Sequence, residues 1–278
     1  MGLYLRPTTV EEALAALKGG NLTVIAGGTD FYPARVGRPL DEDILDITAI
    51  PSLRSIEDKG GHWRIGATTT WTDVLRADLP PLFAGLKLAA REIGGVQIQN
   101  TGTVCGNLCN ASPAADGVPA LLSLDARVEL DAGAGLLPLA EFITGNRRTL
   151  RRPDQLVTAL IIPKPDGRSA GHFVKLGARR YLVISIVMAA ASLAVDDRRR
   201  IRLARVAVGS CTPVACRLPG LEAALAGQQA DGNLGALVLP DHLSALAPID
   251  DIRASADYRR EAAVTLVRRL LNELGGRS

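Results

Sequence analysis

Aromatic residues are scarce in this sequence of 278 residues, since Phe, Trp and Tyr together make up 4% of it. Only three histidines and four cysteines are present. The longest apolar stretch, residues 182–195, is interrupted by two serines and is shorter than the roughly 20 apolar residues that a membrane-spanning helix needs. We therefore expect a core segment there and no transmembrane segment.

Two common nucleotide-binding motifs are also missing. The sequence contains no G-x-x-x-x-G-K-[ST] loop, and no G-x-G-x-x-G follows a strand with an acidic residue downstream. The histidines, His62, His172 and His242, lie far apart, and there is no G-x-S-x-G motif. These absences argue against a metal site and against a hydrolase with a His-activated nucleophile.

The cysteines and charges narrow the class of protein further. Cys105/Cys109 and Cys211/Cys216 have neither the spacing of a zinc knuckle nor that of an iron–sulfur cluster, so we expect four reduced, mostly buried thiols. Residues 1–7 lack the features of a secretory signal, which predicts a cytoplasmic protein. Lys plus Arg number 32 against 29 for Asp plus Glu, and apart from two short Arg runs the basic residues are scattered. We therefore predict no nucleic-acid partner.

The length favours two domains, and local patterns predict the elements of the first one. Thr9 and Glu12 fit a capping box at the start of a helix that Gly19 and Gly20 end. We expect strands at 22–26, 44–47, 63–67, 127–130 and 156–162, and helices at 81–92 and 120–124.

The segment from Pro163 to Gly171 is the best linker in the sequence, and we place the domain boundary within it. Beyond it we expect strands at 173–176, 184–195 and 201–208, and helices at 218–226, 234–239 and 257–274. The last helix carries one apolar stripe, which favours a core position over a cofactor site.

Two glycine-rich segments, residues 26–30 and 102–116, have the composition of a ligand site. Residues 97–118 show no steady period of 2 or 3.6, which predicts either a floppy loop or a ligand cradle. Glycine permits positive φ and close approach of a ligand. The hydroxyls and amides of this region can bond phosphate or ribityl oxygens, and its carboxylate, that of Asp116, can accept from ribityl or ribose hydroxyls. Composition alone leaves a packing role for these small residues equally open. The polar side chains concerned are Thr29, Thr103, Asn107, Asn110, Ser112 and Asp116.

These two segments, AGGTD and GTVCGNLCNASPAAD, closely resemble the flavin-binding motifs of one family. That family comprises the FAD-binding, or medium, subunits of molybdenum hydroxylases of the xanthine dehydrogenase and carbon monoxide dehydrogenase type. Its motifs read A-G-G-T-D or A-G-G-H-S, and G-T-I-G-G-N-L-x-N-A-S-P-A-A-D. The likeness extends over nearly the whole chain, through LAEFI at 139–143, Lys175 with Arg179, residues 209–213 and DDIRASADYR at 250–259.

The resemblance implies an α+β fold with an FAD-binding domain of the vanillyl-alcohol oxidase type. Residues 1–166 would form this domain, in subdomains of about 1–55 and 56–166, and residues 167–278 would form a C-terminal domain with a small antiparallel sheet and helices. The resemblance also implies two partners, a small subunit with two [2Fe-2S] clusters and a large subunit with the molybdenum pterin, assembled as a dimer of heterotrimers. The cofactor implied for this chain is FAD.

By position, the resemblance assigns residues around FAD and none with a catalytic or metal-binding role. Tyr181 is the weakest of these assignments, because it is equally plausible as an ordinary sheet tyrosine. The assigned residues are Val24, Ile25, Ala26, Gly27, Gly28, Thr29, Asp30, Phe31, Ile93, Thr103, Val104, Cys105, Gly106, Asn107, Asn110, Ser112, Asp116, Val157, Lys175 and Tyr181.

One departure from the family pattern concerns Cys105, since the second motif usually has Gly-Gly where this chain has Cys105-Gly106.

The implied activity is electron transfer from the clusters through FAD to an acceptor such as NAD, a quinone or oxygen. Two alternatives are a stand-alone flavin enzyme of the same fold and an assembly subunit that has lost FAD. The intact Gly27, Gly28, Asn107 and Asp116 argue against the second alternative.

Overall fold

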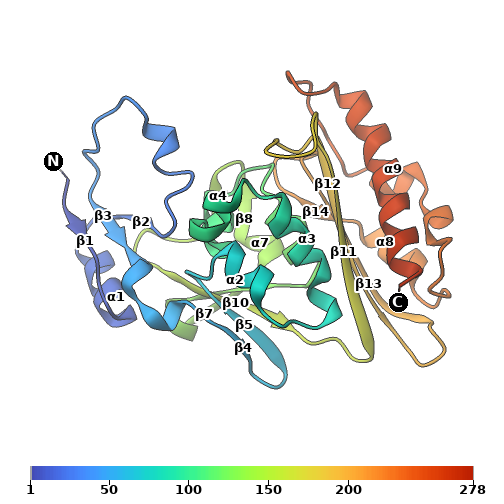
Figure 1. Cartoon of the computed structure of the whole chain (residues 1–278), viewed down its shortest axis with the longest axis horizontal. Helices are drawn as coiled ribbons and strands as arrows, with labels where there is room; N and C mark the ends of the chain where they lie inside the picture. Colours follow the sequence, from blue (N-terminus) through green and yellow to red (C-terminus); the bar gives the residue numbers. More distant parts are fainter. Residues whose placement is uncertain (1, 278) are drawn as a thin grey trace.

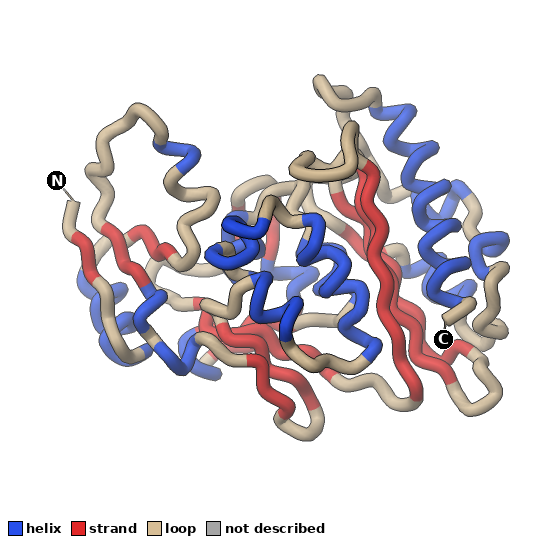
Figure 2. Tube along the Cα trace, viewed as in Figure 1, coloured by secondary structure: helices blue, strands red, loops and turns tan. Residues whose placement is uncertain are grey.

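The computed structural model describes residues 2–277, which form three larger sheets that follow one another along the molecule and one two-stranded sheet, β8-β9 (Figure 1). The N-terminal sheet lies at one end and the C-terminal helix α9 at the other, so the two termini are far apart. Helices and loops separate the sheets (Figure 2). Within the described residues no helix is long and apolar enough to cross a membrane.

The first sheet is small and parallel, with strand order β1-β3-β2. The predicted capping box is present at the start of its helix α1, where Thr9 Oγ1 accepts a hydrogen bond from the Glu12 N–H at 3.2 Å. A long loop, residues 26–43, joins β2 to β3 and stands above this sheet in Figure 1. The elements are β1 (Tyr4–Leu5), α1 (Val10–Gly19), β2 (Thr23–Ile25), η1 (Pro33–Arg35), β3 (Ile44–Asp46), η2 (Ile47–Ala49) and η3 (Pro51–Leu53).

The second sheet is antiparallel, with strand order β4-β5-β10-β6-β7. Its central strand β10 lies between the hairpin β4–β5 and strand β6, and short helices occupy the chain from β5 to β6. The elements are β4 (Ile56–Asp58), β5 (His62–Gly66), α2 (Trp71–Arg76), η4 (Pro81–Phe83), α3 (Ala84–Glu92), α4 (Val96–Thr101), α5 (Val104–Asn110), α6 (Gly117–Ser123), β6 (Arg127–Leu130), η5 (Asp131–Gly133), β7 (Gly135–Pro138), α7 (Leu139–Phe142), β8 (Ile143–Gly145), β9 (Arg148–Thr149) and β10 (Val157–Pro163).

The third sheet, of order β11-β12-β13-β14, is covered on both faces. Alternate residues of β12 enter different cores: Met188 and Ala190 pack with α3 and α6, whereas Ala189 and Leu193 pack with α8 and α9. All nine residues of β12 are buried, which explains the apolar run in the sequence. The elements are β11 (Arg168–Leu176), β12 (Val187–Val195), β13 (Ile201–Gly209), β14 (Cys216–Arg217), α8 (Pro219–Leu225), η6 (Leu234–Leu237), η7 (Pro240–Leu243) and α9 (Ala256–Gly275).

Three sequence-based expectations need correction. Residues 97–118 contain α4, α5 and the start of α6, so the first of the two alternatives for this segment, a floppy loop, is wrong. The helices α4 and α5 have six and seven residues, too few turns for a helical period to be visible. The linker is shorter than expected, because β11 already begins at Arg168, and the helix expected at 234–239 is the 3₁₀ turn η6.

Candidate cofactor site

The two glycine-rich segments meet where Gly27 lies against the end of α4. A Cβ on Gly27 would clash with the carbonyl oxygen of Thr101, so this approach requires glycine. A Cβ on Gly102 would likewise come within 3.2 Å of Thr29 Oγ1. The next residue of the first motif, Gly28, has a φ of 65°, in the left-handed region that favours glycine. Sequence positions about 75 residues apart thus form one wall.

The start of α5 is held beside this wall by backbone and side-chain hydrogen bonds. Thr103 is the N-cap, and its Oγ1 accepts from the Gly106 N–H at 3.0 Å. The Val104 N–H donates to the Thr69 carbonyl at 3.0 Å, and the Trp71 N–H donates to the Gly102 carbonyl at 3.2 Å. The first turn of α5 is therefore fixed in position before any ligand arrives.

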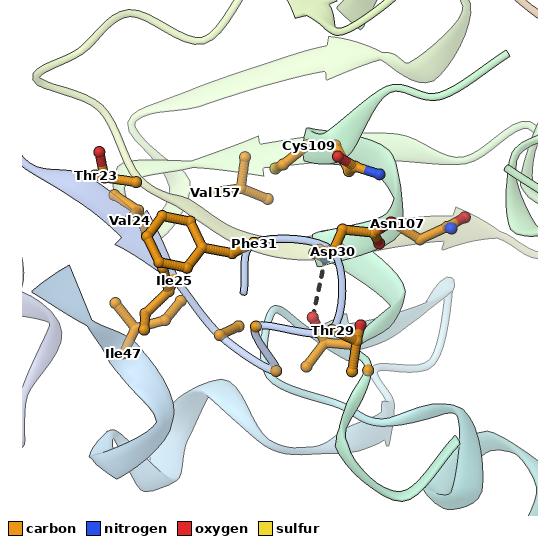
Figure 3. Close-up of a pocket in the computed structure, with 18 of the residues that line it drawn as sticks. Thr23, Val24, Ile25, Thr29, Asp30, Phe31, Ile47, Asn107, Cys109 and Val157 are labelled. Atoms are coloured by element: carbon orange, nitrogen blue, oxygen red, sulfur yellow. Dashed lines mark hydrogen bonds between the residues drawn. The ribbon is translucent and has the colours of Figure 1, made fainter. Parts of the chain in front are cut away.

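A cavity of about 590 Å³ lies between the two segments (Figure 3). This volume falls within the roughly 300–1,000 Å³ of small-molecule and cofactor sites. Most of the residues assigned from the sequence line it. They are Val24, Ile25, Ala26, Gly27, Gly28, Thr29, Asp30, Phe31, Ile93, Thr103, Cys105, Gly106, Asn107, Asn110 and Val157.

Five assigned residues do not line this cavity. Val104 is buried in the core, and Ser112 Oγ accepts from the Ala114 N–H in the turn after α5. Tyr181 is 64% exposed in the loop between β11 and β12, with the Arg180 guanidinium 5.3 Å from its ring centre. The remaining two, Asp116 and Lys175, form a buried ion pair at 2.7 Å.

This ion pair lies beside the cavity wall. Lys175 Nζ also donates to the carbonyl of Glu92 at 3.4 Å, and Glu92 precedes the cavity residue Ile93. Ser185 donates a short hydrogen bond to the other carboxylate oxygen of Asp116. Burial raises the pKa of Asp116, and the nearby Lys175 ammonium opposes that rise.

Several cavity residues were not identified from the sequence. Three of them are basic, Arg35, Arg147 and Arg151. In the described residues, Arg147 and Arg151 form no salt bridge; Arg147 donates to the Asn110 side chain and Arg151 to the carbonyls of Arg152 and Gln155. Arg35 pairs with Glu42. The others include Asn21, Leu22, Thr23, Ala34, Ile47, Ala67, Trp71, Ile98, Gly102, Cys109, Thr149, Pro153 and Leu156.

Two thiols line the cavity, and neither is activated. Burial raises the pKa of Cys105 well above its usual value. Cys109 is exposed and lines the cavity, whereas Cys105 and Cys211 are buried and Cys216 is partly buried. Desolvation still raises the pKa of Cys109 to about 11. Both groups therefore remain protonated thiols at neutral pH.

The chemistry of the wall fits a dinucleotide. Apolar side chains, among them Val24, Ile25, Ile93 and Ile98, line the cavity together with hydroxyl and amide groups. In residues 2–277 the buried Oδ1 of Asn107 has no hydrogen-bond partner, although buried polar atoms normally have one. The guanidinium groups of Arg147 and Arg151, which form no salt bridge within the described residues, can pair with the negative charges of a diphosphate. The fold and cavity together define a protein that binds a nucleotide cofactor.

Comparison with known proteins also indicates a protein that binds a nucleotide cofactor. The model of the FAD binding domain in molybdopterin dehydrogenase matches residues 1–165, and that of the CO dehydrogenase flavoprotein C-terminal domain matches residues 172–274. The FAD subunit of nicotinate dehydrogenase from Eubacterium barkeri is 35% identical over 208 residues, which cover 70% of this chain and 69% of the relative. A putative xanthine dehydrogenase FAD-binding subunit of Escherichia coli (strain K12) is 30% identical, with 97% and 94% covered.

Solved structures show the same likeness over the full chain. Reconstituted CO dehydrogenase from Oligotropha carboxidovorans matches with a TM-score of 0.87 and 25% identity, covering 100% of this chain and 99% of that one. Carbon monoxide dehydrogenase from Hydrogenophaga pseudoflava matches with a TM-score of 0.85 and 26% identity, covering 99% and 98%. The chain belongs to the family of FAD-binding medium subunits of molybdenum hydroxylases. Its cofactor is FAD, as the sequence motifs predicted.

Proposed function

We propose that this chain carries electrons from a small [2Fe-2S] partner subunit to an external acceptor such as NAD, a quinone or oxygen. The observation that carries the proposal is the contact of Gly27 with the end of α4, which joins both flavin motifs around one cavity. When bound there, FAD supplies the conversion between one-electron and two-electron carriers.

The side chains of this chain bind and orient the cofactor. The glycines let the cofactor approach the backbone closely. Thr29 and Asn107 offer hydrogen bonds, and the guanidinium groups of Arg147 and Arg151 offset the negative charge of the diphosphate. Val104, Ser112, Asp116, Lys175 and Tyr181 belong to this proposal as supporting residues. In particular, Lys175 fixes Glu92 and so the adjacent Ile93 in the wall. No side chain acts as a general acid or base.

We propose that residues 1–166 form the FAD-binding domain, with subdomains of about 1–55 and 56–166, and that residues 167–278 form the second domain. The separate sheets β1–β3, β4–β10 and β11–β14 support this division. We further propose a cytoplasmic dimer of heterotrimers that includes a large molybdenum-pterin subunit. The relatives differ in the substrates their names print, nicotinate, xanthine and carbon monoxide, which supports a substrate site on that other subunit.

The test is to purify the chain with its native partners, extract the flavin and quantify it together with iron and molybdenum. We expect about one FAD per copy of this chain and two accompanying subunits. A stoichiometric FMN, or a folded complex without flavin, would contradict the flavin role. Hydroxylation of an organic substrate by the isolated chain without molybdenum would contradict the subunit role, and would favour a stand-alone flavin enzyme.

A further inference from the structure

A buried arginine near the start of α9, Arg259, binds three segments that are far apart in the chain. Its side chain is 4% exposed, and its Nη1 donates to the carbonyl of Ile186 at 2.7 Å and to that of Ser210 at 3.2 Å. Its Nη2 donates to Asp251 Oδ1 at 2.6 Å. These segments meet at the end of the third sheet where the loop between β11 and β12 lies (Figure 1). None of the four residues lines the cofactor cavity.

The bond to Ile186 leads to the buried ion pair beside the cavity. Ile186 directly follows Ser185, whose hydroxyl donates to Asp116 Oδ1. Lys175 binds the other oxygen of this carboxylate at 2.7 Å. Ser185 and Asp116 are 2% and 7% exposed, so the protein itself supplies their hydrogen bonds. By fixing Ile186, Arg259 fixes the direction from which Ser185 reaches Asp116.

The bond to Ser210 leads to the same part of the chain by a second route. The Ser210 N–H donates to the carbonyl of Pro113 at 3.1 Å. Ser210 has a φ of 63°, and a residue other than glycine keeps this conformation only where its surroundings hold it. Pro113 and Asp116 both belong to the turn at residues 111–116, which joins α5 to α6 and ends the second flavin motif. Arg259 therefore holds this turn at two points.

The turn at residues 111–116 in turn sets the position of cavity groups. It follows α5 directly, and Asn107 and Asn110 on α5 line the cavity. The Arg147 N–H donates to the carbonyl of Ala111 at 2.8 Å, and Arg147 also lines the cavity. A shift of the turn would therefore move side chains that face the cofactor.

We propose that Arg259 is a positioning residue for FAD, which holds the turn at residues 111–116, and through it α5, in the arrangement that binds the cofactor. This inference rests on the proposed binding of FAD in the cavity. Within residues 2–277 the Nε of Arg259 has no hydrogen-bond partner, so the burial of its charge is incompletely compensated. A planar guanidinium has donors in fixed directions and can bridge two carbonyls and a carboxylate at once.

The experiment measures the FAD affinity and the unfolding temperature of the full chain, purified with its native partners and freed of flavin. Arg259→Met keeps the length of the side chain, removes its donors and weakens FAD by about tenfold. Ser185→Ala weakens FAD by a similar factor, because it releases Asp116. In the double variant the loss is well below the roughly hundredfold product of two independent effects, since both residues act on one turn.

Arg199→Met is the matched control, because Arg199 binds the opposite end of α9. Its Nη2 donates to the carbonyl of Gly275 at 2.9 Å, and its Nε also lacks a partner in the described part of the chain. Neither Arg199 nor Gly275 lines the cavity. This variant lowers the unfolding temperature as Arg259→Met does, but it changes FAD affinity by less than about twofold, which separates a loss of stability from a loss of positioning.

If Arg259→Met does not fold, Arg259→Lys replaces it, because one ammonium group cannot bridge Ile186 and Ser210, and the same weakening of FAD is expected. Unchanged FAD affinity in the Arg259 variant, or equal weakening in Arg199→Met, overturns the inference and leaves Arg259 with a role in stability alone. Single effects that multiply fully in the double variant overturn the shared route through the turn. A wild type that binds no flavin overturns the proposed function itself.

Discussion

Lys175 and Asp116 form a nearly dry ion pair between β11 and the N-terminus of α6. Their charged atoms are 2.7 Å apart, and their side chains are 5% and 9% exposed. Each charged group is stabilised by the other, because a single buried charge would lose most of its hydration without gaining a partner. The pair therefore couples the third sheet to the helix that follows the second flavin motif.

Breaking this pair should destabilise the chain strongly. We expect Lys175→Met to lower the free energy of unfolding by about 3–5 kcal/mol, because Asp116 is left buried without its partner. The double variant Asp116→Asn/Lys175→Met should lose less than the two single losses combined. Urea unfolding measures this, with Arg260→Met in the exposed Arg260–Asp257 pair as a control that loses about 0–1 kcal/mol. Additive losses would show that the two groups do not interact.

Gly28→Val should remove most of the FAD. The residue has a φ of 65°, which costs a β-branched side chain about 1–2 kcal/mol, and a Cβ there would lie 2.6 Å from the Tyr32 ring. Gly37→Val is the control, since Gly37 has a φ of 76° in the same loop and open space around it. Flavin content after purification distinguishes them. Normal occupancy in Gly28→Val would exclude Gly28 from the binding site.

Cys105 should have no redox role. Burial raises the pKa of its thiol, and so we expect no alkylation by iodoacetamide in the folded chain at pH 8. Cys105→Gly should keep FAD and its rate of reduction while losing about 1–2 kcal/mol of stability, because glycine weakens a helix and leaves a small void. The larger Cys105→Leu should lower flavin occupancy. A Cys105→Gly complex that retains FAD but cannot reduce it would prove the thiol essential.

The ion pair of Asp251 with Arg259 should make the free energy of unfolding depend on pH in the acid range. Burial favours the neutral acid, but hydrogen bonds from the Arg253 N–H and from Arg259 outweigh it and lower the pKa of Asp251 to about 2. A lowered folded-state pKa stabilises the fold above the ordinary pKa of 3.8, and this contribution disappears as pH falls through about 2.

Asp251→Asn should therefore cost about 1 kcal/mol at pH 7, a value reduced from the full linkage because the carboxylate is partly exposed. The cost should shrink as the pH falls from 4 toward 2. Urea unfolding at several pH values measures it, and Asp257→Asn, in an exposed pair, should show little effect at any pH. A cost that is independent of pH would assign the effect to geometry instead of charge.

Local patterns in the sequence predicted much of the fold. The capping box of Thr9 and Glu12 and the strand at 127–130 depend on residues close together in the chain, so both could be identified directly. The helices α4 and α5 could not, because helices this short owe their stability to packing more than to their own sequence. The family motifs nevertheless marked this segment as a binding site.

The sequence by itself determined the cofactor class, because the two motifs consist of small and polar residues at fixed spacing, and each motif is continuous in the chain. Only the tertiary structure decided how the motifs meet and which other residues join them. Arg35, Arg147 and Arg151 come from segments without a recognisable pattern and reach the cavity through loop and hairpin geometry. The sequence named both Asp116 and Lys175, but their contact spans 59 positions and depends on how β11 packs beside α6. Such contacts follow from the packing of whole elements, and no local pattern records them.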